Sequence, residues 1–388
     1  MPNYSYDLPE NYYFGGGHGT FFTPFGIAGL LVAIILIVCL QRKYVIVPFL
    51  LAGILIPQIN NLMVVGLNFQ AVRLLLLAGL IRVLARREWF PTKLNSLDKV
   101  ILYSALVNSV TYCILWKEFG AIVNRMGFLF TALGSYFLLR SLIRNKEDLI
   151  RVIKVFALLV IVTGAVMLYE HMSQRNLFSL LGAPEFASIR NNRVRAAGPF
   201  AHAIIAGTFG VVLIPLFVGL WWYRPYDRLI AGVGIVSSTV MMFSSASSTP
   251  VMTFPAGILA LSLWPLRKQM RTVRWAIVAM LIGLQLVMKA PIWHLLSRTG
   301  GVFGGSGWHR AMLIENFVYH FFDWCLIGTK NNPNWGWSMW DVDNAYVGAG
   351  LTGGLLGFIL FLAVFVYGYR MIGVARKEAE QSRIGMPA

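Results

Sequence analysis

Long apolar runs recur along the whole of this 388-residue chain, and they constrain its fold more than any other feature. Runs of about 18 or more mostly apolar residues are long enough to cross a hydrocarbon core about 30 Å thick. Charged residues make up only 13% of the sequence, about half of the ~25% typical of soluble proteins. The sequence therefore predicts an all-α polytopic membrane protein, a single transmembrane domain over residues 1–388.

Eleven membrane-spanning helices are predicted from these runs. Pro48 and Pro57 interrupt the second run and Asn60-Asn61 follows, so a break is expected there. The predicted segments are 25–40, 45–66, 69–85, 99–116, 120–139, 155–170, 200–222, 229–242, 250–266, 275–290 and 345–369.

The positions of the positive charges predict an orientation. Alternate connections hold 22 of the 33 Lys and Arg residues on one side and nine on the other, and Arg73 and Arg125 lie within helices. The positive-inside rule places the richer side and the C-terminus in the cytoplasm, and the N-terminus outside. It also accounts for most of the net charge of +17, so membrane lipid and not nucleic acid is the expected partner.

Two long connections, 171–199 and 291–344, then face outward, and long loops of compact domains usually carry function. The first holds Arg190, Arg193 and Arg195, just before the seventh helix. In an extended segment residues 193 and 195 point the same way, and guanidinium forks match phosphate oxygens. The cluster predicts a phosphate or diphosphate site. A solvated loop, or contact with anionic lipid headgroups, is the alternative.

Arg73 and Arg125 are each expected a few residues into a membrane helix, just below the outer interface. A charge at the centre of such a helix costs at least ~2.5 kcal/mol and tends to mark a functional site. The alternative is that both side chains reach the headgroups, as a long side chain near a helix end can.

The second long loop carries candidate proton acceptors and aromatic residues. His309-Arg310 and Glu315 belong to a segment, 310–322, that is expected to form an amphipathic surface helix. Residues 334–346 then combine three Trp, two Asp and two Asn, a mixture that suits sugar rings, although Trp also anchors proteins at membrane interfaces. Asp343 in this stretch is a candidate general base for an acceptor hydroxyl.

Other residue patterns carry weaker predictions. The hydroxyl-rich turn 243–250 is expected either to bind sugar or phosphate oxygens or simply to cap helices. His171 and His202 are more often polar groups satisfied within a structure than ligands. No metal-ligand spacing, phosphate-loop signature or dinucleotide fingerprint is present, so neither a metal nor a cofactor is expected.

The order of these features resembles bacterial O-antigen ligases and O-antigen polymerases, which are polytopic glycosyltransferases of the inner membrane. In that family a basic segment precedes a Gly-containing helix start, as in residues 193–202 here, and a Ser-rich turn follows two helices later. A long periplasmic loop then ends in a His-Asn-x-Tyr-Leu-like motif, matched by Asp343-Asn344-Ala345-Tyr346-Val347, with Gly354-Leu355-Leu356-Gly357 beyond. The resemblance covers about residues 150–370.

Three positions depart from the family's pattern. Asp343 stands where many relatives carry His, Thr249-Pro250 stands where an Arg is common, and Thr352 replaces a frequent Glu. The Asp argues against the usual His-centred mechanism, and the turn lacks one phosphate contact.

The resemblance implies a GT-C-like, metal-independent transferase with two long periplasmic loops in the bacterial inner membrane. Its donor would be a polyprenyl-diphosphate-linked glycan, and its acceptor the lipid A-core of lipopolysaccharide, a growing polysaccharide, or a protein. The proton acceptor would be Asp343, His309 or Glu315. The expected substrate-binding residues are Arg190, Arg193, Arg195, Arg310, Arg73, Arg125, Asn344, Tyr346 and His202.

Two other classes of protein stay open. A transporter or flippase of an anionic lipid-linked substrate would distribute charges through the membrane and often repeat one half, and no repeat is found in this sequence. A non-catalytic subunit of an exopolysaccharide assembly machine is the other.

Overall fold

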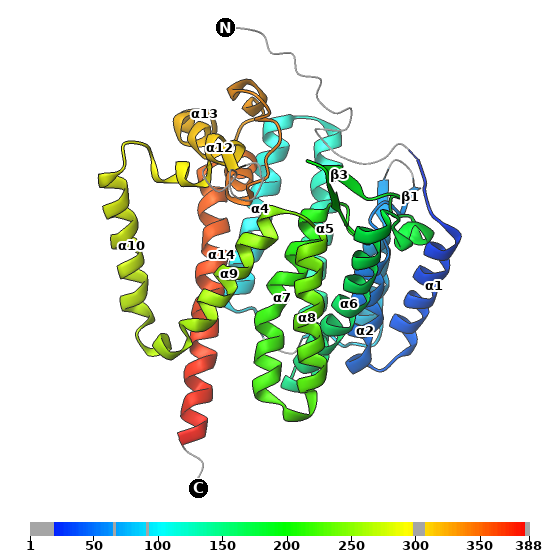
Figure 1. Cartoon of the computed structure of the whole chain (residues 1–388). Helices are drawn as coiled ribbons and strands as arrows, with labels where there is room; N and C mark the ends of the chain where they lie inside the picture. Colours follow the sequence, from blue (N-terminus) through cyan, green and yellow to red (C-terminus); the bar gives the residue numbers. More distant parts are fainter. Residues whose placement is uncertain (1–18, 65–66, 91–92, 298–306, 385–388) are drawn as a thin grey trace. The chain divides into compact units, whose positions relative to one another are not determined.

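The computed structural model describes residues 19–64, 67–90, 93–297 and 307–384. Each of the eleven predicted segments coincides with a helix (Figure 1). The matching helices are α1 (Pro24–Cys39), α2 (Arg42–Leu55), α3 (Ala71–Ala85), α4 (Ser96–Trp116), α5 (Phe119–Leu142), α6 (Lys146–Ser173), α7 (Ala203–Tyr223), α8 (Arg228–Ser244), α9 (Ser248–Ser262), α10 (Met270–Val287) and α14 (Ala345–Ile384).

The length and composition of these helices confirm an all-α membrane protein. Seven candidate spans in the described chain are long and apolar enough to cross a membrane, and α1 and α9 are shorter apolar helices. Many large apolar side chains on these helices are exposed, and α10 buries none of its described residues. Such surfaces suit lipid tails, which solvate apolar side chains as well as a protein core does. The seven candidate spans are Ser96–Trp116, Phe119–Leu142, Lys146–Ser173, Ala203–Tyr223, Pro225–Ser244, Met270–Val287 and Ala345–Gln381.

The second predicted helix was wrong in its last third. Helix α2 ends at Leu55, and the chain then forms an antiparallel hairpin of β1 (Asn61–Val64) and β2 (Leu67–Gln70). Pro48 is accommodated inside the helix, whereas the second proline follows its end. Asn60 is fully buried, and its amide donates to the carbonyls of Pro57 (3.0 Å) and Leu181 (2.6 Å), which holds the backbone out of a helix.

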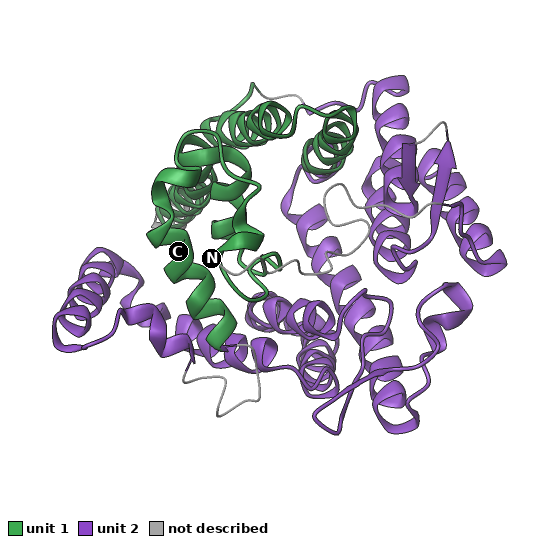
Figure 2. Ribbon diagram, turned by 90° about the horizontal axis from the view of Figure 1, so that it is seen from above, with its two compact units in different colours: residues 1–16, 91–136, 308–388 green, residues 17–90, 137–307 purple. Residues whose placement is uncertain are grey.

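The chain divides into two compact units, each described by itself (Figure 2). The described part of unit 1 falls within Pro91–Tyr136 and Trp308–Ala388, and that of unit 2 within Gly17–Phe90 and Phe137–Gly307.

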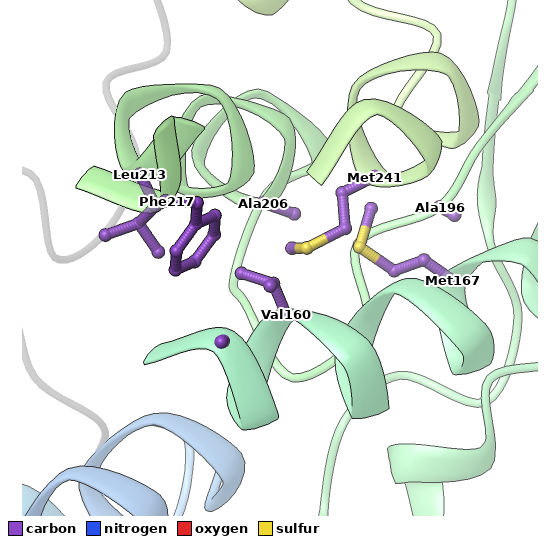
Figure 3. Packing of buried hydrophobic residues seen from close by; sticks show 8 residues of the cluster. Val160, Met167, Ala196, Ala206, Leu213, Phe217 and Met241 are labelled. Carbon is purple, nitrogen blue, oxygen red and sulfur yellow. The ribbon is translucent and has the colours of Figure 1, made fainter. Parts of the chain in front are cut away.

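Helices α6, α7 and α8 form the centre of unit 2. Phe217, Met167 and Met241 are fully buried between them, together with small residues such as Ala206 (Figure 3). Gly164 and Gly210 allow the close approach, because a Cβ on either would come within 3.0 Å of a backbone carbonyl of α8. This packing fixes the ends of the three helices, which carry the candidate site.

Unit 1 is built on the packing of α4 against α14. The predicted last helix is bent and longer than expected: Gly354 has φ +62° and ψ −165°, and the helical path continues to Ile384. The bend brings the Tyr346 ring to 5.6 Å from that of Phe361. The Thr352 hydroxyl contacts the Asn108 side chain of α4 at 3.0 Å, which ties the first part of α14 to this helix.

The second long connection is folded in the part that the structure describes. A helix, α12 (Gly307–Tyr319), covers most of the predicted segment 310–322, and it is followed by the short α13 (Phe321–Trp324) and the 3-10 helix η5 (Asn332–Trp335). The Trp324 indole stacks on Phe317 and donates to the Phe317 carbonyl (2.8 Å). These elements close over an apolar cluster that includes Leu313 and Met339.

Candidate anion-binding site

The predicted arginine cluster lies on a β-hairpin of unit 2. Strands β3 (Ser188–Arg190) and β4 (Arg193–Arg195) pair antiparallel, and Arg190 stands opposite Arg193. Asn191 and Asn192 both have positive φ (51° and 57°), as a two-residue type I′ turn requires and as Asn tolerates. This hairpin was not predicted from the sequence, although two adjacent Asn residues are typical of a two-residue hairpin turn.

The register places all three arginines on one face of the hairpin. Arg193 and Arg195 are two residues apart on one strand, and Arg190 is the cross-strand neighbour of Arg193. Like charges directly opposite each other destabilise a hairpin. Burial, and then the like charge of Arg190, lower the pKa of the Arg195 guanidinium from its ordinary value.

No carboxylate in the described ranges pairs with these arginines. The Arg195 Nε is moreover buried without a hydrogen-bond partner among the described residues. Arginines elsewhere in unit 2 differ, since Asp148 pairs with both Arg42 (3.1 Å) and Arg151 (2.9 Å). The hairpin therefore presents concentrated positive charge that only a ligand or solvent can neutralise.

The base of the hairpin is fixed by buried hydrogen bonds from α6 and the loop after it. Glu170, at the end of α6, accepts from the backbone N–H groups of Ala197 (3.1 Å) and Gly198 (2.8 Å). The Asn176 amide donates to the Gly198 carbonyl (2.8 Å), and Gly198 itself has φ +57°, which favours glycine. Such anchoring is typical of a preorganised loop.

A cavity of about 550 Å³ joins this hairpin to the hydroxyl-rich turn. Arg193 lines it together with Ser247 and Ser248 from the start of α9 and His171 from the last turn of α6. Ligand pockets usually measure ~300–1,000 Å³. Two features that the sequence analysis treated separately, the arginine cluster and the Ser-rich turn, thus meet in one concave site.

His171, which was expected from the sequence to be a polar group satisfied within the structure, is also a residue of this cavity. Its imidazole lines the cavity, and its Nδ1 is buried without a hydrogen bond within the described residues. A His near the outer end of a predicted membrane helix was the only signal in the sequence.

Unit 1 brings two other predicted site residues into contact. The Arg310 Nε donates to the Asp343 Oδ2 at 3.0 Å, and both side chains are about one quarter exposed. The predicted diphosphate contact and the predicted base are therefore an ion pair, in which the guanidinium orients the carboxylate.

The other two candidate bases of unit 1 are less accessible than Asp343. The His309 Nε2 lies 2.9 Å from the Asp341 carbonyl oxygen, which can only accept, so Nε2 carries the proton. Its Nδ1 is buried without a partner among the described residues, and the whole residue is 8% exposed. Glu315 is half-buried on α12.

Of three further predicted substrate contacts, Asn344 and Tyr346 have positions that also suit structural roles, and His202 does not. The Asn344 Oδ1 accepts from the Tyr346 N–H (3.0 Å), which caps α14. The Tyr346 ring packs on Phe361 within unit 1. His202 is exposed at the N-cap of α7 and makes no capping hydrogen bond from its side chain.

The two arginines predicted within helices differ in their surroundings. The Arg73 Nη1 donates to the Asn68 carbonyl of β2 (2.6 Å), a contact that ties α3 to the first hairpin. Arg125, in unit 1, lies with its guanidinium carbon 3.6 Å from the centre of the Tyr112 ring and lines a second cavity.

Within the described residues no group of three or more His, Cys, Asp or Glu side chains is placed to hold a metal ion. Comparisons with family models, with curated proteins and with solved structures found no match to this chain.

Proposed function

We propose that this protein transfers a polyprenyl-diphosphate-linked glycan to a hydroxyl acceptor on the outer face of the bacterial inner membrane, as an O-antigen ligase- or polymerase-like enzyme. One observation carries the proposal. Three arginines share a hairpin face that lacks carboxylate partners in the described chain, and Arg193 lines a concave site with hydroxyls and an imidazole.

The diphosphate is the part of the donor that this site fits. A guanidinium binds phosphate oxygens through paired, charge-assisted hydrogen bonds. Ser247, Ser248 and His171 supply further polar side chains at the wall of the same cavity. In transfer, the bond from the sugar anomeric carbon to the diphosphate oxygen breaks, and the diphosphate leaves with the electron pair. Fixed positive charge stabilises this developing negative charge.

The acceptor oxygen must form the new bond to the anomeric carbon and lose its proton. Asp343 is the best-placed proton acceptor of unit 1, because its side chain is 28% exposed and Arg310 orients it. Buried His309 and half-buried Glu315 are less accessible.

We also propose that the chain crosses the membrane eleven times, with its N-terminus in the periplasm and its C-terminus in the cytoplasm. The 22-to-9 distribution of Lys and Arg supports that orientation. The hairpin and the second long connection would then face the periplasm, where the lipid-linked donor is available. The acceptor is a glycan, a lipid or a protein that carries a free hydroxyl.

The proposal is tested by separating charge from shape at the hairpin. The double variant Arg193→Lys, Arg195→Lys keeps both charges but cannot reproduce the planar fork of donors. Losing a hydrogen bond to a charged group costs roughly 1.5–3 kcal/mol, so we expect transfer to fall about ten- to hundredfold. The measurement is glycan transfer in a deletion strain, with membrane levels of each variant matched by immunoblot.

Arg175→Lys is the matched control, since Arg175 is an exposed arginine of the same connection outside the hairpin. It should transfer normally. Full activity of the double variant would reject diphosphate recognition and leave only attraction to anionic headgroups. Binding of a lipid-linked diphosphate without any transfer by the unaltered protein would instead favour the transporter or the assembly subunit.

A further inference from the structure

Unit 1 contains a second, smaller cavity that the proposed transfer reaction does not use. Its volume is about 260 Å³, just below the usual range of ligand pockets, so it suits one small ring rather than a larger ligand. It lies where the end of α4 meets α5, η5 and the first part of α14. Its walls are formed by Tyr112, Trp116, Arg125, Thr329, Lys330, Asn332, Trp340, Val342, Gly348, Leu351 and Thr352.

Two cations enter this cavity, and no Asp or Glu is among the described residues that line it. The Arg125 guanidinium lies flat against the Tyr112 ring at 3.6 Å, and its Nε is buried without a hydrogen-bond partner in the described chain. The Lys330 Nζ lies 5.3 Å from the centre of the Trp116 ring. Both cations thus lie against aromatic rings, and together they place two positive charges at the wall of the cavity.

The remaining walls are aromatic or already hydrogen-bonded. Trp116 and Trp340 offer flat apolar surfaces, and the C–H face of a sugar ring packs against such surfaces through dispersion. The Thr352 hydroxyl is engaged by Asn108, and the Asn332 amide donates to the Met339 carbonyl (2.9 Å). The cavity thus combines aromatic walls for a ring with two cations for an acidic group.

We infer that this cavity binds one acidic sugar, a monosaccharide unit that bears a carboxylate or a phosphate. The inference stands apart from the proposed transfer, because binding here needs neither a donor nor the hairpin arginines. A simple anion such as phosphate could bind between the two cations, but it would leave the aromatic walls of the cavity without a contact. A neutral sugar covers the walls but leaves the half-buried Arg125 guanidinium without an anion, which is unfavourable.

The test is calorimetric binding to the full-length protein in nanodiscs of zwitterionic lipid. A disaccharide of glucuronic acid and glucose should bind at least tenfold more tightly than cellobiose, and also more tightly than inorganic phosphate. Arg125→Gln and Lys330→Gln should each weaken binding of the acidic disaccharide about ten- to hundredfold, the effect of losing one charged hydrogen bond. Lys330 is exposed, so its variant keeps the test valid should the Arg125 variant fail to fold.

Lys117→Gln is the matched control, because Lys117 is the exposed C-cap of α4 and does not line the cavity. It should bind like the unaltered protein. Equal binding of the acidic and neutral disaccharides, or equal binding of phosphate, would overturn the inference. So would an equal effect of Lys117→Gln, or loss of binding when phosphatidylglycerol is added to the nanodiscs. Arg193→Lys, Arg195→Lys should leave this binding unchanged even if it abolishes transfer, so the two proposals fail independently.

Discussion

Arg82 of α3 is almost completely buried, and its whole guanidinium is satisfied from within the protein. Its Nε and Nη2 each lie 3.0 Å from an oxygen of Glu88, and its Nη1 donates to the carbonyls of Ile37 (2.7 Å) and Val38 (2.9 Å). A buried charge tolerates desolvation only with partners of this kind. On the Arg190–Arg195 hairpin only the half-buried Arg195 falls short of that standard, because its Nε is buried without a partner among the described residues.

At the same scale, Asp343 is expected to act as a base rather than as a structural carboxylate. Asp343→Asn keeps an oxygen that accepts from Arg310 but removes the proton acceptor, so transfer should fall about 10²- to 10⁴-fold, the usual contribution of general acid–base catalysis. The assay is single-turnover transfer by purified protein, with donor binding measured in parallel and expected to be unchanged.

Asp341→Asn is the control, because Asp341 is exposed in the same segment and uses its backbone carbonyl, not its side chain, to contact His309. Asp343→Asn with normal transfer, or with transfer and stability lost together, would remove Asp343 from the mechanism.

At the scale of elements, helices were predictable and their interruptions were not. Each apolar run contains a helix, although α2 ends well before its run does, because a helix satisfies its own backbone hydrogen bonds. The hairpin β1–β2 and the bend at Gly354 depend instead on distant partners, namely the Asn60 contact with Leu181 and the approach of Leu326 to Gly354. No local pattern in the sequence reports contacts of that kind.

The candidate site was likewise predictable only in part. The three arginines and their alternation were visible in the sequence. The cavity that Arg193 shares with His171 and Ser247 depends instead on how the hairpin lies against α6, α8 and α9. The ion pair of Arg310 with Asp343 was likewise not predictable, since it joins residues that lie 33 positions apart.

The bend in α14 should depend on glycine at position 354. Gly354→Ala would place a Cβ against the Leu326 carbonyl oxygen in a backbone of φ +62°, so we expect a loss of more than about 1 kcal/mol in the free energy of unfolding. Gly368→Ala is the matched control further along the same helix, where a Cβ meets nothing within 4 Å, and it should be neutral or stabilising. The midpoint of thermal unfolding in detergent measures both, and an equal response would refute the role of the bend.

At the scale of the whole molecule, the orientation of the chain in the membrane decides which face meets the substrate. Ser188→Cys on the hairpin and Gln381→Cys near the C-terminus, in a background without Cys39, Cys113 and Cys325, report on opposite sides. An impermeant maleimide should label Ser188→Cys on intact spheroplasts, and Gln381→Cys only after permeabilisation. The reverse pattern would invert the topology and remove the hairpin from the periplasm.

The like charges of the hairpin also couple its folding to its ligand. Three guanidinium groups on one face repel each other whenever the face is empty, and an anion that bridges them removes this repulsion only in the folded state. A ligand that binds only the folded state raises the free energy of unfolding, and the effect grows as the ligand concentration rises above the dissociation constant. In a cell the empty hairpin would then open more often than the occupied one, and scarcity of the ligand would expose this segment to proteases.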